Sequence, residues 1–294
     1  MTDAVEVIEC RTADELLEAL HPRRGKWPAA PGTWFFRGQG DSTWSLLPSS
    51  LRGIKAFEAF GLHPASYEEE GVDFWERVFL LQFYRLTNRA GLPIPRAEAL
   101  SKLETTYFAS DEHPYPHPDL EPLLALAQHN GVPTRLLDWS SSRKVAAYFA
   151  GSDALATGSK SLDVWALNSN FIAFTAAKTD LSCRIVRTLR HGNPNLHAQA
   201  GVFTLCRGQI RRDDGNYVAL DELVTATARE LGGIDSQLPC LRRFQLPSTE
   251  AQALLEELHL DQVDAVTLFP GYPGIVRSLR EQRWRPFFIP IDHS

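Results

Sequence analysis

The sequence lacks the features that define membrane, secreted and zinc-binding proteins. No stretch approaches the roughly 18 uncharged apolar residues that a membrane span needs, and the N-terminus has neither the charged nor the apolar region of a signal peptide. The few cysteines are dispersed without the paired spacing of zinc sites, at Cys10, Cys183, Cys206 and Cys240. We therefore expect a cytoplasmic protein with free, buried thiols, no membrane association and no bound metal.

The phosphate-binding motifs of two large classes of nucleotide enzymes are missing too. No Gly-x-Gly-x-x-Gly follows an expected strand, and no Gly-Lys-Ser/Thr loop occurs, so neither a Rossmann nor a P-loop enzyme is supported. A formal net charge of −6 argues against a protein that coats nucleic acid nonspecifically. Any dinucleotide would have to be held by side chains.

What the chain does have is enough apolar content for a large core. Its 294 residues are 44% hydrophobic, and no repeat or long linker divides them, so we predict a single domain over residues 1–294. Apolar periodicity predicts a long helix over residues 66–88, the first half of a helical insertion at about residues 66–130. Strands are predicted at residues 34–37, 162–167, 201–206, 242–246 and 287–291, whereas residues 175–190 are ambiguous and could form a loop over a site.

Polar groups of several kinds gather in residues 128–138, between two apolar helical stretches. The Asn-Gly pair at 130–131 is a typical helix end, and Pro133 forces the residue before it into an extended conformation. Arg135 and Asp138 would need partners in the buried run that follows, because an unpaired buried charge costs several kcal/mol. One interpretation is a structural ion pair between them. A binding or catalytic site is favoured by three polar neighbours, Gln128, His129 and Thr134.

A second polar segment, residues 33–40, contains the strand-forming aromatic residues 34–36. Arg37 stands where the apolar strand ends, a position suited to a phosphate or carboxylate clamp. Gly38 and Gly40 would let backbone amides approach a ligand. Both segments hold more polar groups than a core can satisfy internally, so we predict that they line one cleft although about 90 residues separate them.

Arginines are clustered elsewhere in the chain. They gather at residues 184–190, 207–212, 242–243 and 277–285. Such clusters can bind phosphates, but a three-residue spacing on a helix is also typical of an ordinary solvated face. Both interpretations stay open.

The polar segments resemble the FRG domain, a family named for the triplet that stands here as Phe36-Arg37-Gly38. Residues 128–139, Gln-His-Asn-Gly-Val-Pro-Thr-Arg-Leu-Leu-Asp-Trp, are similar to the central signature of the family, and residues 146–150 to the helix that follows it. Similar blocks at 193–203 and 268–274 extend the resemblance over about residues 33–280. One departure is Asn195, where a basic residue is expected in relatives.

The resemblance implies a divergent relative of the ADP-ribosyltransferases. The implied fold is α+β, with a mostly antiparallel split sheet that grips NAD as a substrate and with a helical insertion. Arg37 stands in the place of the first-strand residue that holds the dinucleotide, and Arg135 is a second candidate for the pyrophosphate. Gln39 and Thr134 are candidate ribose or nicotinamide contacts. Two further candidates to bind NAD are Gln128 and His129.

The predicted catalytic residues are Arg37, Asp138 and Gln199. As nicotinamide leaves, the ribose acquires oxocarbenium character, which a carboxylate near the anomeric carbon stabilises. Asp138 would stabilise this charge or orient Arg135. Gln199 precedes the strand at 201–206, where such transferases present a third motif that often carries Glu. An amide at that position cannot deprotonate an acceptor.

The function implied by the resemblance is NAD-dependent ADP-ribosylation by a toxin or phage-defence effector, with RNA or another macromolecule as the target. Its partners would be an RNA or protein acceptor and an antitoxin or other inhibitory protein that lets the host tolerate it. The alternative is a noncatalytic module that senses a nucleotide or a nucleic acid. A nuclease or other hydrolase also stays open, because a few carboxylates and arginines never exclude one.

Overall fold

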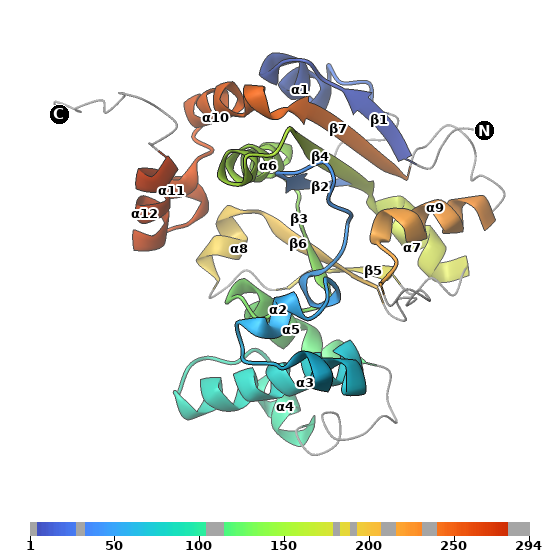
Figure 1. Ribbon diagram of the computed structural model, residues 1–294, viewed down its shortest axis with the longest axis vertical. Helices are drawn as coiled ribbons and strands as arrows, with labels where there is room; N and C mark the ends of the chain where they lie inside the picture. The colour runs from blue at the N-terminus through green and yellow to red at the C-terminus, as the bar shows by residue number, and fades with distance from the viewer. Residues whose placement is uncertain are drawn as a thin grey trace.

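The apolar strands of the chain assemble into one mixed, mostly antiparallel sheet. The computed structural model describes residues 5–27, 33–103, 115–178, 183–188, 193–206, 216–230 and 240–281. Within them, an α+β fold is built on a seven-stranded sheet in the order β1-β7-β4-β2-β3-β6-β5 (Figure 1). The strands are β1 (Val5–Glu9), β2 (Trp34–Gln39), β3 (Leu136–Ser140), β4 (Ser161–Asn168), β5 (Cys183–Val186), β6 (Gly201–Cys206) and β7 (Leu241–Pro247). β1 and β7 are parallel, and the other neighbours are antiparallel.

Helices with small or apolar faces cover one side of the sheet. They are α1 (Ala13–Leu20), α6 (Arg143–Thr157) and α10 (Ala251–Leu260), the last preceded by a 3-10 turn, η3 (Ser248–Glu250). Alanines of α6 pack on β2 and β4, because small side chains let a helix approach a sheet closely. Leu254 and Leu258 of α10 complete this layer of the core.

The opposite side of the sheet is covered by α7 (Ser169–Lys178) and α9 (Leu220–Glu230). Their apolar residues pack with Trp139 of β3 and Trp165 of β4 in a second buried cluster. β4 is therefore buried on both faces, which explains why its central residues 164–167 are all apolar rather than alternating.

A helical segment connects β2 to β3 and lies below the sheet in Figure 1. It contains η1 (Ser49–Leu51), α2 (Lys55–Glu58), α3 (Pro64–Arg89), α4 (Ala97–Leu103), η2 (Pro118–Leu120) and α5 (Glu121–His129). The helix predicted over 66–88 is confirmed as part of α3, although Gly71 has φ 79° and interrupts its helical backbone. Leu80, Leu123 and Leu124 of this segment pack against Phe203 of β6.

Short helices close one end of the sheet beside α6. They are α8 (Pro194–Ala198), α11 (Ala265–Leu268) and α12 (Tyr272–Glu281), and Figure 1 shows them on the left. The buried residues of α12 are Gly274 and Glu281, so this helix does not bury its apolar side chains. Its apolar side chains are exposed at spacings of three and four residues, at Tyr272, Ile275, Val276 and Leu279.

The predicted strands at 34–37, 162–167, 201–206 and 242–246 are confirmed as β2, β4, β6 and β7. Within the ambiguous range 175–190, the structure places the end of α7 and the strand β5, which pairs with β6 at the sheet edge. Residues 179–182 and 189–190 lie outside the described residues, so a loop over the site stays a prediction. The predicted strand at 287–291 lies outside the described residues. All four cysteines are free and buried, as expected.

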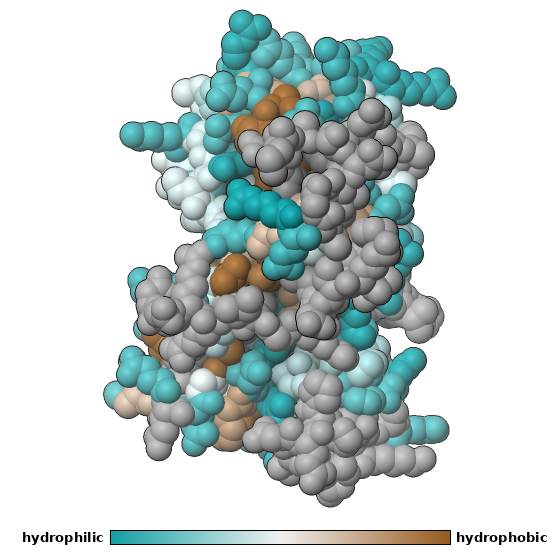
Figure 2. Space-filling model, turned by 90° about the vertical axis from the view of Figure 1, so that its right-hand side faces the viewer, coloured by the Kyte–Doolittle hydropathy of each residue, from teal (hydrophilic) through white to brown (hydrophobic). Residues whose placement is uncertain are grey.

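The face on the right of Figure 1 is drawn in Figure 2, where the coloured hydrophobic residues form separate patches among hydrophilic ones. Val7, on the edge strand β1, is exposed. Among the helices of the described segments, none combines the length and the apolar character that crossing a membrane would require.

Candidate functional site

The sheet is split between β2 and β3. These strands pair at one position, Phe36 with Ser140, whereas β2 pairs with β4 along its whole length. Arg37, the next residue of β2, bridges the separation, because its Nη1 donates a hydrogen bond to the carbonyl oxygen of Asp138 at 2.9 Å. The guanidinium thus takes the place of a hydrogen bond between the two backbones.

Gly38 and Gly40 bring β2 against the backbone of α6. A Cβ atom at position 38 would lie 2.0 Å from the carbonyl oxygen of Ala146, and one at position 40 would lie 2.4 Å from the carbonyl carbon of Asp153. Any residue with a Cβ atom would clash with α6 at these two positions. The two glycines therefore admit the backbone of α6, which places Asp153 near Arg37. Gly38 also lines the cavity between β2 and β3, so its approach to a ligand stays a prediction, whereas Gly40 does not line that cavity.

A cavity opens where β2 and β3 separate, and we call it the split-sheet pocket. It has a volume of about 440 Å³. The residues that line it come from β2, β3, β6, α6, the end of α5 and the segments around α8, α11 and α12. Its aromatic wall consists of Phe36, Trp139, Phe149, Phe203 and Phe269. Its polar side chains are Arg37, His129, Asp138, Ser140, Asp153, Asn195, Gln199 and Arg277.

Of the two arginines in the predicted polar segments, Arg37 lines this pocket. Its side chain is 15% exposed, and its Nη1 lies 3.8 Å from Asp138 Oδ2. Its Nε is buried and has no hydrogen-bond partner in the part of the chain that the structure describes. Burial lowers the pKa of Arg37, whereas the charge of Asp138 acts in the opposite direction. The guanidinium stays charged, because its usual pKa is far above neutrality.

Asp138 and His129 stand together at the pocket, as predicted. The Asp138 side chain is 60% exposed. His129 ends α5, and its Nε2 is 3.3 Å from the Nδ2 of Asn195 on α8. Burial lowers the pKa of His129, and the charge of Asp138 partly offsets this effect. Asn195, the departure from the expected family pattern, therefore contacts a predicted site residue.

Gln199 lines the pocket but is held by the fold. Its backbone oxygen accepts a hydrogen bond from Ser140 Oγ at 2.7 Å, and its Nε2 donates to the carbonyl oxygen of Leu268 at 3.1 Å. The backbone carbonyl of Gln199 thus ties the segment before β6 to β3, and its side-chain amide ties it to α11. Its position near Arg37 and Asp138 agrees with the prediction.

Arg135 is not part of the split-sheet pocket. Its Nε donates to Glu76 Oε2 at 2.8 Å, its Nη2 contacts Asp73, and its guanidinium lies 4.5 Å from the ring centre of Tyr115. The predicted pairing with Asp138 was wrong, because residues an odd number apart on an extended chain point to opposite faces. Arg135 is instead a buried structural cation that ties α3 to the start of β3.

Thr134 and Gln128 also lie outside the pocket lining and hydrogen-bond to each other. Thr134 is 1% exposed, and its backbone carbonyl accepts hydrogen bonds from the Ser49 hydroxyl and the Ser50 amide. These contacts satisfy the polar groups within the fold. The prediction that both residues share a cleft with Arg37 was wrong.

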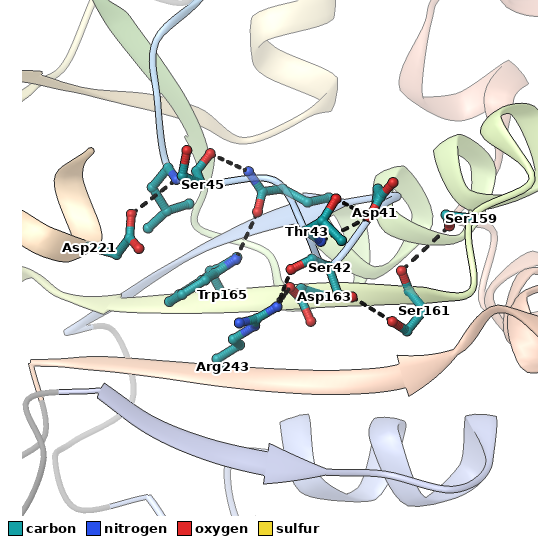
Figure 3. A network of polar contacts seen from close by, with 12 residues as sticks. Asp41, Ser42, Thr43, Ser45, Ser159, Ser161, Asp163, Trp165, Asp221 and Arg243 are labelled. Carbon is teal, nitrogen blue, oxygen red and sulfur yellow. Dashed lines mark hydrogen bonds and ion pairs between the residues drawn. The ribbon is translucent and has the colours of Figure 1, made fainter. Parts of the chain in front are cut away.

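Gln39 is likewise a structural residue. It is 2% exposed, its Oε1 accepts from Trp165 Nε1 at 2.8 Å, and its Nε2 donates to the Ser45 carbonyl at 3.1 Å. Figure 3 shows the surrounding network, in which Arg243 pairs with the fully buried Asp163 at 2.6 Å. The predicted role of Gln39 as a ribose or nicotinamide contact is not supported by this position, because its amide already has both partners.

Two charged pocket residues were missed by the sequence reasoning. Asp153 belongs to α6 and is 44% exposed, and Arg277 reaches the pocket from α12. Asp153 was detectable in principle, because it follows Ala146 by seven residues and so shares the face of α6 that packs on β2. In the sequence, Arg277 stood out only as a member of an arginine cluster, which indicates either phosphate binding or an ordinary solvated helix face.

A larger hollow of about 950 Å³ lies between α1, β7 and the start of α6. Its cations are mostly paired with its anions, for example Arg242 with Glu6 at 2.7 Å and Lys144 with Asp261 at 2.6 Å. None of the predicted site residues lines it. The described residues contain no group of three or more His, Cys, Asp or Glu side chains placed to hold a metal ion.

The Phe36-Arg37-Gly38 triplet of β2 and residues 136–140 of β3 meet where the two strands separate. Residues 32–158 match the family model of the FRG domain. The chain contains an FRG domain. Arg37, Asp138 and Asp153 belong to this domain segment, whereas Gln199 and Arg277 reach the pocket from outside it. No curated protein and no solved structure shows a significant match to the chain.

Proposed function

We propose that this FRG protein binds NAD in the split-sheet pocket and transfers its ADP-ribose to RNA or another macromolecule. The observation that carries the proposal is the state of Arg37, which is 15% exposed in the pocket and hydrogen-bonded through one nitrogen. Its buried Nε has no hydrogen-bond partner among the described residues. A partly desolvated guanidinium favours an anionic ligand, because its planar fork matches phosphate oxygens. A split sheet with an arginine on its first central strand is also what the resemblance to ADP-ribosyltransferases implies.

The pocket also offers walls for the uncharged parts of such a substrate. Trp139, Phe149 and Phe269 line it, and the rings of Phe149 and Phe269 are 5.9 Å apart in an edge-to-face arrangement. Aromatic walls favour flat rings such as nicotinamide or adenine, which bury apolar faces and keep polar edges. The volume of about 440 Å³ fits part of a dinucleotide, with the remainder at the open rim.

The reaction breaks the bond between ribose and nicotinamide and forms a bond from the same ribose carbon to a nucleophile of the acceptor. Asp138 is the carboxylate for the developing positive charge, because its exposed oxygens stand beside Arg37 at the pocket. The proton of the acceptor needs a base. His129 is suited to accept it, because burial lowers its pKa and so keeps the imidazole neutral.

Gln199 takes no proton in this scheme. Its amide donates to Leu268 and cannot act as a base, so its role is to hold the pocket wall. In this scheme no Glu is needed at position 199. Asp138 stabilises the positive charge on the ribose, and His129 accepts the proton of the acceptor.

The test compares variants of Arg37 in NAD consumption. Purified protein is incubated with labelled NAD and total RNA or bacterial lysate, and both nicotinamide release and label transfer are measured. Arg37→Lys keeps the charge but loses the planar fork, so we expect it to fold normally and to lose most activity. Arg37→Ala should lose essentially all activity. Arg89→Lys, at the exposed end of α3, is the matched control.

Full activity in folded Arg37→Lys and Arg37→Ala would remove Arg37 from the site and contradict the proposal. Growth arrest on expression of the wild type, absent with Arg37→Ala, would support the role of a toxin or phage-defence effector. Such a protein needs an antitoxin or other inhibitory partner in its host, and co-expression of that partner should relieve the arrest.

A second candidate function is noncatalytic sensing of a nucleotide. The observation that favours it is Gln199, an amide where a transferase often carries a carboxylate, already committed to Leu268. Tight binding of NAD without nicotinamide release in any acceptor mixture would support sensing. Release of nicotinamide that depends on Asp138 would contradict it.

A further inference from the structure

Asp153 lines the split-sheet pocket together with two guanidinium groups. It faces the pocket from α6, whereas Arg37 comes from β2 and Arg277 from α12. Asp153 Oδ1 is 3.9 Å from Arg277 Nη2, which is a long ion pair. Arg37 and Asp153 also act on each other through their charges. Within the described part of the chain, neither guanidinium donates a hydrogen bond to this carboxylate, so one anion serves two cations loosely.

Contacts on its other side fix Arg277 at the pocket wall. Its Nε donates to Glu281 Oε1 at 3.1 Å, its Nη2 donates to Ser152 Oγ at 3.0 Å, and its guanidinium lies 4.5 Å from the ring centre of Phe269. Glu281 is itself held by the Tyr148 hydroxyl at 2.6 Å. The guanidinium is therefore preorganised, which reduces the entropy lost when it binds an anion.

The interactions of Asp153 with these cations stabilise its position only weakly. Its side chain is 44% exposed, and exposed ion pairs at this distance contribute little to stability. Burial raises the pKa of Asp153, and nearby Glu281 adds to the rise, whereas Arg277 and Arg37 oppose it. A doubly charged ligand that offers planar, charge-assisted contacts to both arginines would therefore compete well with this single carboxylate.

We propose that the split-sheet pocket is a diphosphate site in which Asp153 holds the place of a phosphate group until the ligand arrives. Arg37 and Arg277 bind the two phosphates of a nucleoside diphosphate, and Asp153 turns away when they do. The inference rests on the proposed function, because NAD carries such a diphosphate. It adds Arg277, which lies outside the segment matched at residues 32–158, and an internal anion that competes with the ligand.

The test measures ligand binding rather than turnover, by calorimetry on the full chain with ADP-ribose, ADP and AMP. The wild type should bind ADP more tightly than AMP. Arg277→Ala should weaken ADP-ribose binding by about tenfold or more and abolish the preference for ADP, because a charge-assisted contact is lost. Asp153→Asn should instead tighten ADP-ribose binding severalfold. Arg280→Ala, exposed on the same helix, is the control and should bind as the wild type does.

The opposite signs expected at Asp153 and Arg277 separate this mechanism from general damage to the pocket. If Arg277→Ala does not melt as the wild type does, Arg277→Lys decides, because it keeps the charge but loses the fork and should still reduce the preference for ADP. Equal affinities of the wild type for ADP and AMP would overturn the inference. So would a folded Asp153→Asn variant whose affinity for ADP-ribose is unchanged or weaker.

Failure of the inference and failure of the proposed function are distinguishable. If the variants behave as expected and no NAD is consumed, the transferase proposal falls and the diphosphate site stands. If NAD is consumed but Arg277→Lys and Asp153→Asn bind ADP-ribose as the wild type does, the diphosphate site falls and the transferase proposal stands.

Discussion

The buried ion pair of Glu76 and Arg135 gives a stability test that is independent of function. Glu76 is 1% exposed and Arg135 5%, and the carboxylate accepts from the Arg135 backbone amide at 2.7 Å and from its Nε at 2.8 Å. Glu76→Ala would remove both bonds and leave the guanidinium with Asp73, whose side chain is 63% exposed. Removing one partner of a buried pair costs about 3–5 kcal/mol, because the remaining charge is stranded.

We therefore expect Glu76→Ala to lower the free energy of unfolding by about 4 kcal/mol. For 294 residues the entropy of unfolding is about 0.6 kcal/mol per degree, so the melting temperature should fall by about 6 °C. Urea unfolding followed by tryptophan fluorescence measures the first quantity, and calorimetry the second. Glu70→Ala, exposed on the same helix α3, is the control and should change stability by less than about 0.5 kcal/mol.

The companion variant is Asp138→Ala, which would be the damaging one if Asp138 were the partner of Arg135. Its side chain is 60% exposed and 3.8 Å from Arg37, so we expect a loss within about 1 kcal/mol. The reasoning would be refuted by a Glu76→Ala variant as stable as Glu70→Ala, or by a loss near 4 kcal/mol in Asp138→Ala.

Three further predictions concern the surroundings of the pocket. Gly38→Ala should fold poorly, because its Cβ would lie 2.0 Å from a backbone oxygen of α6; soluble yield and melting temperature check this. Gln39→Leu should destabilise the protein by about 1–3 kcal/mol, because the buried indole N–H of Trp165 loses its acceptor, yet ADP-ribose binding should persist in calorimetry. In NMR titrations His129 should have a pKa below that of a free histidine, because burial disfavours its charged form, and Asp138→Asn should lower it further by removing a favourable charge.

Local signals in the sequence were sufficient for much of the fold. The Asn-Gly pair ends α5, where Asn130 is the C-cap and Gly131 has φ 87°. Ser142 caps α6 by accepting from the Val145 amide, and the predicted strand at 201–206 coincides with β6. Such features depend on residues close in sequence, so the conformational preferences of a few neighbours decide them.

Charge pairing was not predictable, because it depends on contacts between distant segments. The sequence showed that a buried Arg135 needs a partner, and Asp138 was the nearest candidate. The actual partner, Glu76, is 59 residues away on α3. Strand parity alone argued against Asp138, because residues 135 and 138 point to opposite faces, but no local rule identifies Glu76. The sequence therefore predicted that Arg135 forms an ion pair, but it did not identify the partner.

The role of Arg277 could not be predicted, because the hydrophobic pattern of α12 indicates the wrong buried face. The apolar stripe of α12 predicts an inward face formed by residues such as Ile275 and Leu279, yet these are exposed at 47% and 59%. The helix is held to α6 instead through Arg277 and Glu281, which contact Ser152 and each other. The same guanidinium that anchors α12 is the one we assign to a ligand phosphate. Ligand binding and the position of α12 are therefore thermodynamically linked, since each depends on where that charge is satisfied.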